Sequence, residues 1–282
     1  MSKRKGFTLI EVTLFLGVTA ALFLGVALSM GNAIDQQKYN DSVQSFAEYL
    51  RGIYSMVSNP QSGGQGNSET AIYGRLIVFG EKTDFAGKDI TDYDGRPVFS
   101  YDVIGDVEPP YGATGTVSQI MSSLNVNVVR TPKDARGRIT TVELAQPEQF
   151  SLRWETDVQN IDGSVFSGSI LIVRHPRSGT INTLVMPGTV IDVNKEALQA
   201  KGAYESGHSY PAITELLKKY LDDSPGSAKF KTDELNFCIS PYNRGESGGI
   251  PRQNIRLIKN SRNASGVVMI ETDGGDNKCT TR

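Results

Sequence analysis

The sequence of 282 residues predicts an α+β fold, in which a long N-terminal helix packs on an antiparallel, β-rich head with a small helical insertion. Three features lead to this prediction. A long apolar run lies near the start of the chain, and an amphipathic pattern with helical spacing follows it. Short β-branched runs separated by turn residues then fill most of the remainder. The first half of the helix is expected to span a membrane.

The apolar run covers residues 12–34 and contains no charged side chain. In a helix this length rises about 34 Å, which is enough to cross the hydrocarbon core of a bilayer. Lys3, Arg4 and Lys5 precede the run, and basic residues in this position stay on the cytoplasmic side. We therefore expect a single-pass protein of the cytoplasmic membrane with its head outside.

Glu11 lies at the start of this apolar segment, where an unpaired carboxylate costs about 2.5–3.5 kcal/mol on insertion scales. Two interpretations leave it unexplained: a secretory signal peptide cleaved after Ser29, whose apolar region would be shorter, and a plain N-terminal anchor. A cut between Gly6 and Phe7 supplies a partner. The new ammonium group of Phe7 would lie four positions before Glu11, on the same helix face.

Residues 3–12, KRKGFTLIEV, resemble the N-terminal signature of type IV prepilins and the related pseudopilins. The resemblance implies that a prepilin peptidase cuts after Gly6 and methylates Phe7. It implies that Glu11 sets the register of subunits in an extracellular or periplasmic filament. The partners implied are other pilin subunits, the inner-membrane assembly machinery, and membrane lipid before assembly.

The expected organisation follows the chain in order. A leader peptide covers residues 1–6, a transmembrane and filament-core helix covers 7–34, and an amphipathic helix covers 35–58. Apolar residues at three- and four-residue steps mark the amphipathic helix, and a stretch rich in Pro, Gly and Ser ends it. The β-rich globular head covers 72–282.

Short runs rich in β-branched residues predict the strands of the head, and turn residues such as Asp162-Gly163 separate them. A change of pattern marks residues 195–234 as an insertion, with a short amphipathic helix near 210–221. The expected strands are 71–79, 98–104, 124–130, 139–144, 150–155, 169–174, 181–186, 235–240, 254–259 and 267–271.

The two cysteines, Cys238 and Cys279, bound the C-terminal region 238–279. In a head outside the membrane a disulfide is expected, with two buried free thiols as the alternative. The resemblance to pilins implies that such a disulfide encloses a variable, exposed region. A zinc site is not expected, because His175 and His208 lack ligand spacing to a cysteine.

Basic residues gather between Arg244 and Arg262, although the formal net charge of the whole chain is −2. Arg252 and Arg256 share one face of the expected strand, Lys259 lies on the other face, and Arg262 follows. Such a row could bind DNA or another anionic ligand through its charges. The preferred interpretation is a solvated strand face, since basic edge strands also discourage aggregation.

The sequence contains no nucleophile elbow, phosphate-binding loop or paired metal ligands. The aspartates near residues 89–94 and 273–277 lack EF-hand spacing and fit turn chemistry. We therefore expect no enzymatic activity, cofactor or metal. A secreted or membrane-anchored enzyme remains as an alternative that predicts cleavage after Ser29 or none.

The middle of the head carries a second, looser resemblance. The segments FSLRW at 150–154 and VRHPRSGT at 173–180 are similar to the H-type minor pseudopilins and their minor-pilin relatives. His175 and the helical insertion depart from that pattern. The size of the chain and its insertion favour a minor pilin or pseudopilin over a major subunit. The expected function is structural, and a pilus-borne receptor for DNA or a surface ligand is the alternative.

Overall fold

The computed structural model describes residues 8–59, 70–81, 86, 88–90, 97–106, 125–126, 129–130, 143–144, 147–154, 156–175, 178–205, 230–231, 233–241, 253–259, 261–271 and 279. These residues form an α+β fold with antiparallel sheets, as expected. The chain divides into two compact units, Met1–Asp41 and Ser42–Arg282. The expected helix at 210–221 and the leader at 1–6 lie outside the described residues.

A single helix, α1 (Leu9–Ser58), contains both the apolar run and the amphipathic segment. In the first unit, the stretch Leu9–Val26 has a mean hydropathy of 2.2, so it is long and apolar enough to cross a membrane. In the second unit, α1 buries one face in the head, as the helical spacing of its apolar residues predicts. The buried side chains on that face are Val43, Phe46, Ala47, Leu50, Ile53, Tyr54 and Val57.

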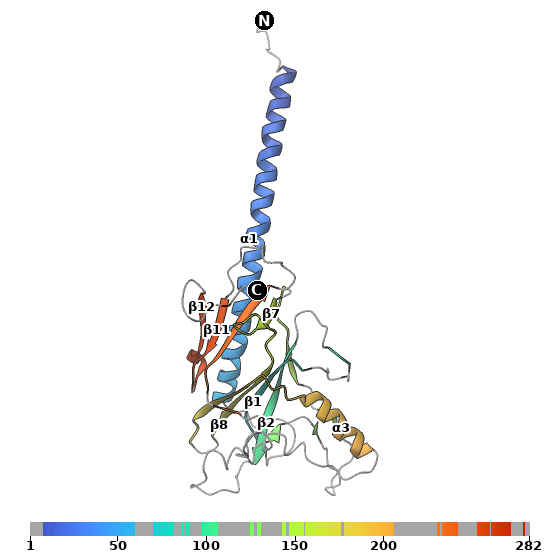
Figure 1. Ribbon diagram of the computed structural model, residues 1–282, viewed down its shortest axis with the longest axis vertical. Helices are drawn as coiled ribbons and strands as arrows, with labels where there is room; N and C mark the ends of the chain where they lie inside the picture. The colour runs from blue at the N-terminus through green and yellow to red at the C-terminus, as the bar shows by residue number, and fades with distance from the viewer. Residues whose placement is uncertain are drawn as a thin grey trace. The chain divides into compact units, whose positions relative to one another are not determined.

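The larger sheet contains six described strands in the order β3-β2-β1-β8-β9, with β6 paired to β2. All its strand pairs are antiparallel. The strands are β1 (Thr70–Phe79), β2 (Val98–Asp106), β3 (Asn125–Val126), β6 (Glu148–Phe150), β8 (Gly168–Arg174) and β9 (Ile181–Pro187). Figure 1 shows β1, β2 and β8 in this sheet.

The smaller sheet has the order β12-β11-β10-β7 and is also antiparallel (Figure 1). Its strands are β7 (Thr156–Gln159), β10 (Leu235–Pro241), β11 (Gln253–Leu257) and β12 (Val267–Glu271), with a short 3-10 helix, η2 (Ala264–Gly266), before β12. A separate pair joins β4 (Val129–Arg130) and β5 (Glu143–Leu144).

An aromatic cluster joins α1 to both sheets. The ring of Phe46 lies 6.2 Å from Phe79 of β1, 5.9 Å from Phe150 of β6 and 5.8 Å from Phe237 of β10, measured between centroids. Phe166 completes the cluster, 4.8 Å from Phe237 in an edge-to-face arrangement. Edge-to-face pairs contribute beyond the area that they bury, so this cluster helps to hold the helix on both sheets.

Several expected elements differ from the structure. The expected strand 150–155 is wrong: β6 ends at Phe150, and β7 begins at Thr156 after a bend in which Trp154 has a φ of 60°. The expected strand 124–130 is interrupted, since β3 and β4 belong to different sheets. The strand at 254–259 ends at Leu257, because Ser261 donates its N–H to the Ile258 carbonyl and closes a turn.

A helix that the sequence analysis did not anticipate, α3 (Val193–Glu205), follows β9. Its N-terminus is capped by Asp192, whose Oδ1 accepts the Lys195 N–H at 3.1 Å. Ile191, Val193 and Ala197 are buried in a core cluster with strands of the larger sheet. Apolar burial therefore fixes the start of α3 against that sheet.

Candidate functional site

The first turn of α1 is closed by a reciprocal pair of side chains. Thr8 donates its N–H and its Oγ1 hydroxyl to Glu11 Oε2 at 2.9 and 3.0 Å. Glu11 returns its own N–H to Thr8 Oγ1 at 3.3 Å. This is a capping box, in which a threonine before the helix and a glutamate in its first turn satisfy backbone donors that would otherwise lack partners.

The capping box gives Glu11 a local partner that the sequence analysis overlooked, although the spacing Thr-x-x-Glu was present at residues 8–11. It directs the carboxylate towards the N-terminal end of α1. Gly6 and Phe7, the expected cleavage and methylation residues, lie outside the described residues.

Beyond Glu11, α1 exposes apolar side chains on all sides. Two threonines in this stretch keep their hydroxyls within the helix: Thr13 Oγ1 donates to the Ile10 carbonyl at 3.0 Å, and Thr19 Oγ1 donates to the Phe15 carbonyl at 2.8 Å. Internal satisfaction of polar groups suits a helix that lies in lipid or among other apolar helices. The large apolar side chains that are at least 60% exposed in this stretch are Leu14, Phe15, Leu16, Leu22, Phe23 and Leu24.

The described basic residues of this region lie in different local environments. Arg256, in β11, pairs with Glu234 at 2.6 Å, and this hydrogen bond lowers the pKa of the Glu234 carboxyl. Its neighbour on the same strand face, Asn254, is fully buried. Lys259 and Arg262 are exposed in the segment after β11, and Arg252 lies outside the described residues. The described part of β11 therefore presents no open basic row.

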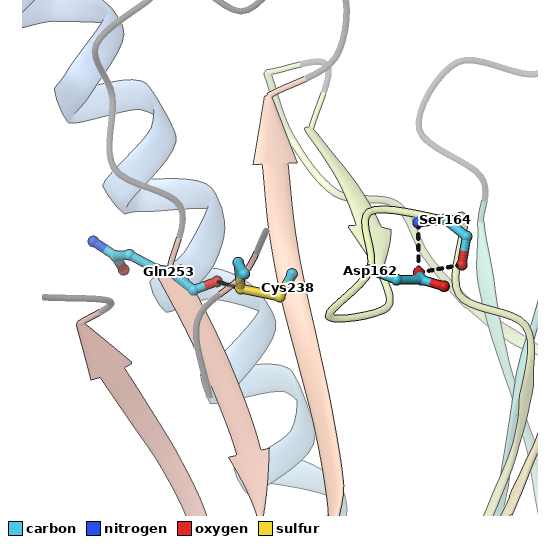
Figure 2. Close-up of a disulfide and its surroundings, with 5 residues drawn as sticks. Asp162, Ser164, Cys238 and Gln253 are labelled. Carbon is cyan, nitrogen blue, oxygen red and sulfur yellow. Dashed lines mark hydrogen bonds between the residues drawn. A yellow bond between two sulfur atoms is a disulfide. The ribbon is translucent and has the colours of Figure 1, made fainter. Parts of the chain in front are cut away.

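The expected disulfide between Cys238 and Cys279 is present, and the two residues have a sequence separation of 41 (Figure 2). Cys238 is fully buried in β10, and Cys279 Sγ lies 3.9 Å from the carbonyl oxygen of Gln253 in β11. The bond thus fastens Cys279 beside the β10–β11 pair. The region that it bounds includes β11 and β12, which are integral strands of the smaller sheet.

Figure 2 also shows Asp162 and Ser164, which lie on either side of Gly163 in the turn that the sequence predicted. Ser164 donates its N–H and its hydroxyl to Asp162 Oδ1 at 2.8 and 2.6 Å. Gly163 has a φ of 82°, a conformation that glycine adopts readily. Side-chain chemistry of this kind is that of a structural turn. Within the described residues, no group of three or more His, Cys, Asp or Glu side chains is arranged to hold a metal ion.

The head contains a buried polar cluster that the sequence analysis did not predict. Glu81, which follows β1, accepts the Asn194 N–H of α3 at 3.0 Å on Oε1. Its Oε2 lies 2.6 Å from Tyr101 Oη of β2 and accepts an N–H of the Asn194 amide at 3.1 Å. Burial raises the pKa of the Glu81 carboxyl to about 8, against the lowering effect of these hydrogen bonds.

The described residues thus define an α+β protein with a single N-terminal apolar helix and one disulfide in the head. Comparison with protein-family models, with curated proteins and with solved structures finds no match to this chain.

Proposed function

We propose that this chain is a type IV minor pilin or pseudopilin. A prepilin peptidase cleaves it after Gly6 and methylates Phe7, and the processed chain becomes a structural subunit of a pilus or secretion filament. The observation that carries the proposal is the position of Glu11, which lies in the first turn of α1 and is the only charged residue in the exposed, apolar stretch Leu9–Val26.

The exposed apolar side chains of Leu9–Val26 require a cover. Lipid provides it while the chain waits in the membrane, with its head outside. In a filament the same surface packs against the equivalent helices of other subunits, where dispersion and close packing replace lipid contacts.

Glu11 gives that packing a register. The capping box satisfies lone pairs of the carboxylate but does not neutralise its charge. The ammonium group of a processed Phe7, on the same chain or on a neighbour, would neutralise it. A misaligned neighbour would leave a buried charge unpaired, which is strongly unfavourable.

The second half of α1 supports the structural role. Its buried face packs on strands of both sheets, so this part of α1 and the sheets form one compact unit. The Cys238–Cys279 disulfide suits a head outside the reducing cytoplasm. A DNA receptor has less support, because Arg256 is engaged by Glu234 and Asn254 beside it is buried.

The first test is the mass of the N-terminal peptide of the protein recovered from its own cells. A peptide that starts at methylated Phe7 is the expected result. A start at Met30 would indicate an ordinary signal peptide, and an intact Met1 or Ser2 would indicate a plain anchor. Either of these results rejects the proposal.

A matched pair of variants separates the two roles of Glu11. Thr8→Ala removes the capping box and keeps the charge, whereas Glu11→Gln removes the charge and keeps a side chain of the same length. We expect Glu11→Gln to leave cleavage intact and to abolish recovery of the subunit in sheared filaments, and Thr8→Ala to retain assembly. Equal loss in both variants would mean that Glu11 acts as a helix cap alone.

A further inference from the structure

Glu81 links three elements of the head that are far apart in sequence. It follows β1, whereas Tyr101 lies in β2 and Asn194 lies at the start of α3. Its side chain is only 3% exposed, and all the contacts are within the head unit. These contacts do not depend on the proposed filament function.

The number of protons in the cluster decides its charge state. Tyr101 Oη lies 2.6 Å from Glu81 Oε2 and 2.9 Å from Asn194 Oδ1, two oxygen atoms that both need a hydrogen. A tyrosine has one hydroxyl proton, so an ionised Glu81 leaves one of these contacts as a repulsion between lone pairs. If Glu81 is protonated, its hydroxyl donates to Tyr101 Oη, and Tyr101 donates to Asn194. Every contact is then a hydrogen bond.

We propose that Glu81 is a proton-dependent latch for α3. The protonated carboxyl holds the N-terminus of the helix on the larger sheet, and ionisation releases it.

The charges around the Glu81 carboxyl favour its protonated form. The titratable groups that the described residues bring to Glu81 are Tyr101, from β2, and Asp192, from the turn before α3. Asp192 is a like charge and opposes ionisation, as does burial, which is the larger effect. Burial likewise raises the pKa of Tyr101, so the phenol keeps its proton. The hydrogen bonds to the Glu81 carboxyl, including that from the Asn194 N–H, lower its pKa, but their effect is smaller than that of burial.

Release would uncover a defined part of the head. Ile191, Val193 and Ala197 belong to one buried core cluster with residues of the larger sheet, and they would separate from it with α3. Further along the chain, Lys231 exchanges backbone hydrogen bonds with Val185 of β9 at 2.7 and 2.8 Å. Glu81 thus contacts the chain at the start of α3, and β9 contacts it again at Lys231. Opening at Glu81 frees the start of α3 while the sheets stay paired.

Hydrogen exchange of the full chain in detergent tests the latch. Protection of the α3 amides is measured between pH 5.5 and 7.5 and compared at each pH with a Glu81→Gln variant, so that intrinsic exchange rates cancel. Glutamine is neutral at every pH and can donate to Tyr101 and accept from Asn194. The pKa of Glu81 is about 8 when closed and near 4.5 when open, so wild-type opening rises about tenfold per pH unit.

The expected result is that α3 of the wild type loses about one hundredfold protection relative to Glu81→Gln over this range, while β8 does not change. Equal protection in both proteins, or simultaneous loss in β8, would overturn the proposal. Asp192→Asn gives a second test that does not depend on the folding of Glu81→Gln. It keeps an acceptor for the Lys195 N–H but removes the like charge, so when the measurement is extended above pH 8, opening of α3 should reach its plateau at a lower pH than in the wild type. An unchanged profile would contradict the latch.

Discussion

The guanidinium of Arg174, at the end of β8, donates through Nη1 to the carbonyl oxygen of Ser58, the last residue of α1, at 2.7 Å. The final carbonyls of a helix lack partners within it and carry its negative dipole end. Arg174 therefore caps the C-terminus of α1, although it lies 116 positions after Ser58 in the sequence. The β8–β9 turn makes room for it, because Gly179 has a φ of 68° and carries no Cβ against the guanidinium.

Replacing Arg174 should weaken the junction between α1 and the larger sheet. We expect Arg174→Met, which keeps most of the stem, to lower the free energy of unfolding by about 1–2 kcal/mol. Arg174→Lys should lose less, because it keeps the charge. Urea unfolding of the full chain in detergent measures both. Equal stability of the methionine variant and the wild type would show that the contact contributes nothing.

Trp154 is the only described non-glycine residue with a positive φ, and its side chain is 53% exposed. Its bend is fixed by neighbours: Thr156 Oγ1 donates to the Arg153 carbonyl at 2.9 Å and lies 2.5 Å from Ser42 Oγ of α1. Thr156 uses its one proton on Arg153, so Ser42 is the donor in the second bond. The bend holds Trp154 in a conformation that costs about 1–2 kcal/mol for a residue with a Cβ.

This strain predicts an inverted order of stability between two variants. Trp154→Gly should be more stable than Trp154→Ala by about 1 kcal/mol, because both remove the ring but only glycine adopts a positive φ freely. Arg153, with an ordinary φ, is the matched control, and there the glycine variant should be the less stable. Chemical denaturation of the glycine and alanine variants at Trp154 and Arg153 measures their order of stability. The usual order at both positions would mean that Trp154 is unstrained.

How much of this fold the sequence predicts depends on how local each signal is. Helix α1 and the strands β1, β8 and β9 follow from periodic patterns within single segments, and their predicted bounds agree closely with the structure. The strand expected at 150–155 was wrong because an apolar and aromatic run suits a strand, whereas the bend depends on Ser42, 114 positions from Thr156. For α3, Asp192 was a usable cap signal, but the apolar stripe behind it is weak.

The candidate sites follow the same rule. Thr8 and Glu11 are three positions apart, and the Thr-x-x-Glu pattern can be read directly. Glu81 and Asn194 are 113 positions apart, and Arg256 and Glu234 are 22 apart across a strand pair. Only the fold brings these partners together, so sequence reasoning left Arg256 as a free cation and gave Glu81 no role.

The disulfide should contribute substantially to the stability of the head. Closing a loop over 41 positions predicts that the Cys238→Ala/Cys279→Ala variant loses about 4 kcal/mol on the chain-entropy model. Urea unfolding of the full chain measures the loss. A thiol reductant should weaken the wild type by a similar amount and leave the double variant unchanged. An effect of the reductant on the double variant would place the sensitivity elsewhere.

Two glycines should respond in opposite ways to the same substitution. Gly74 lies in β1 beside an irregularity in its pairing with β2, and a Cβ there would meet the Ile172 carbonyl oxygen and lie 2.8 Å from Val173 Cα. Both contacts are to backbone of the paired strand β8, which cannot move aside as a flexible side chain could. Gly74→Ala should therefore cost about 3 kcal/mol through overpacking.

Gly52, in the exposed face of α1, has no neighbour within 4 Å of a Cβ position. Gly52→Ala should stabilise the helix by about 1 kcal/mol, because alanine loses less conformational freedom there. Unfolding free energies of both variants in one detergent give the comparison, and a Gly74→Ala protein as stable as the wild type would show that β1 and β8 can separate at this point.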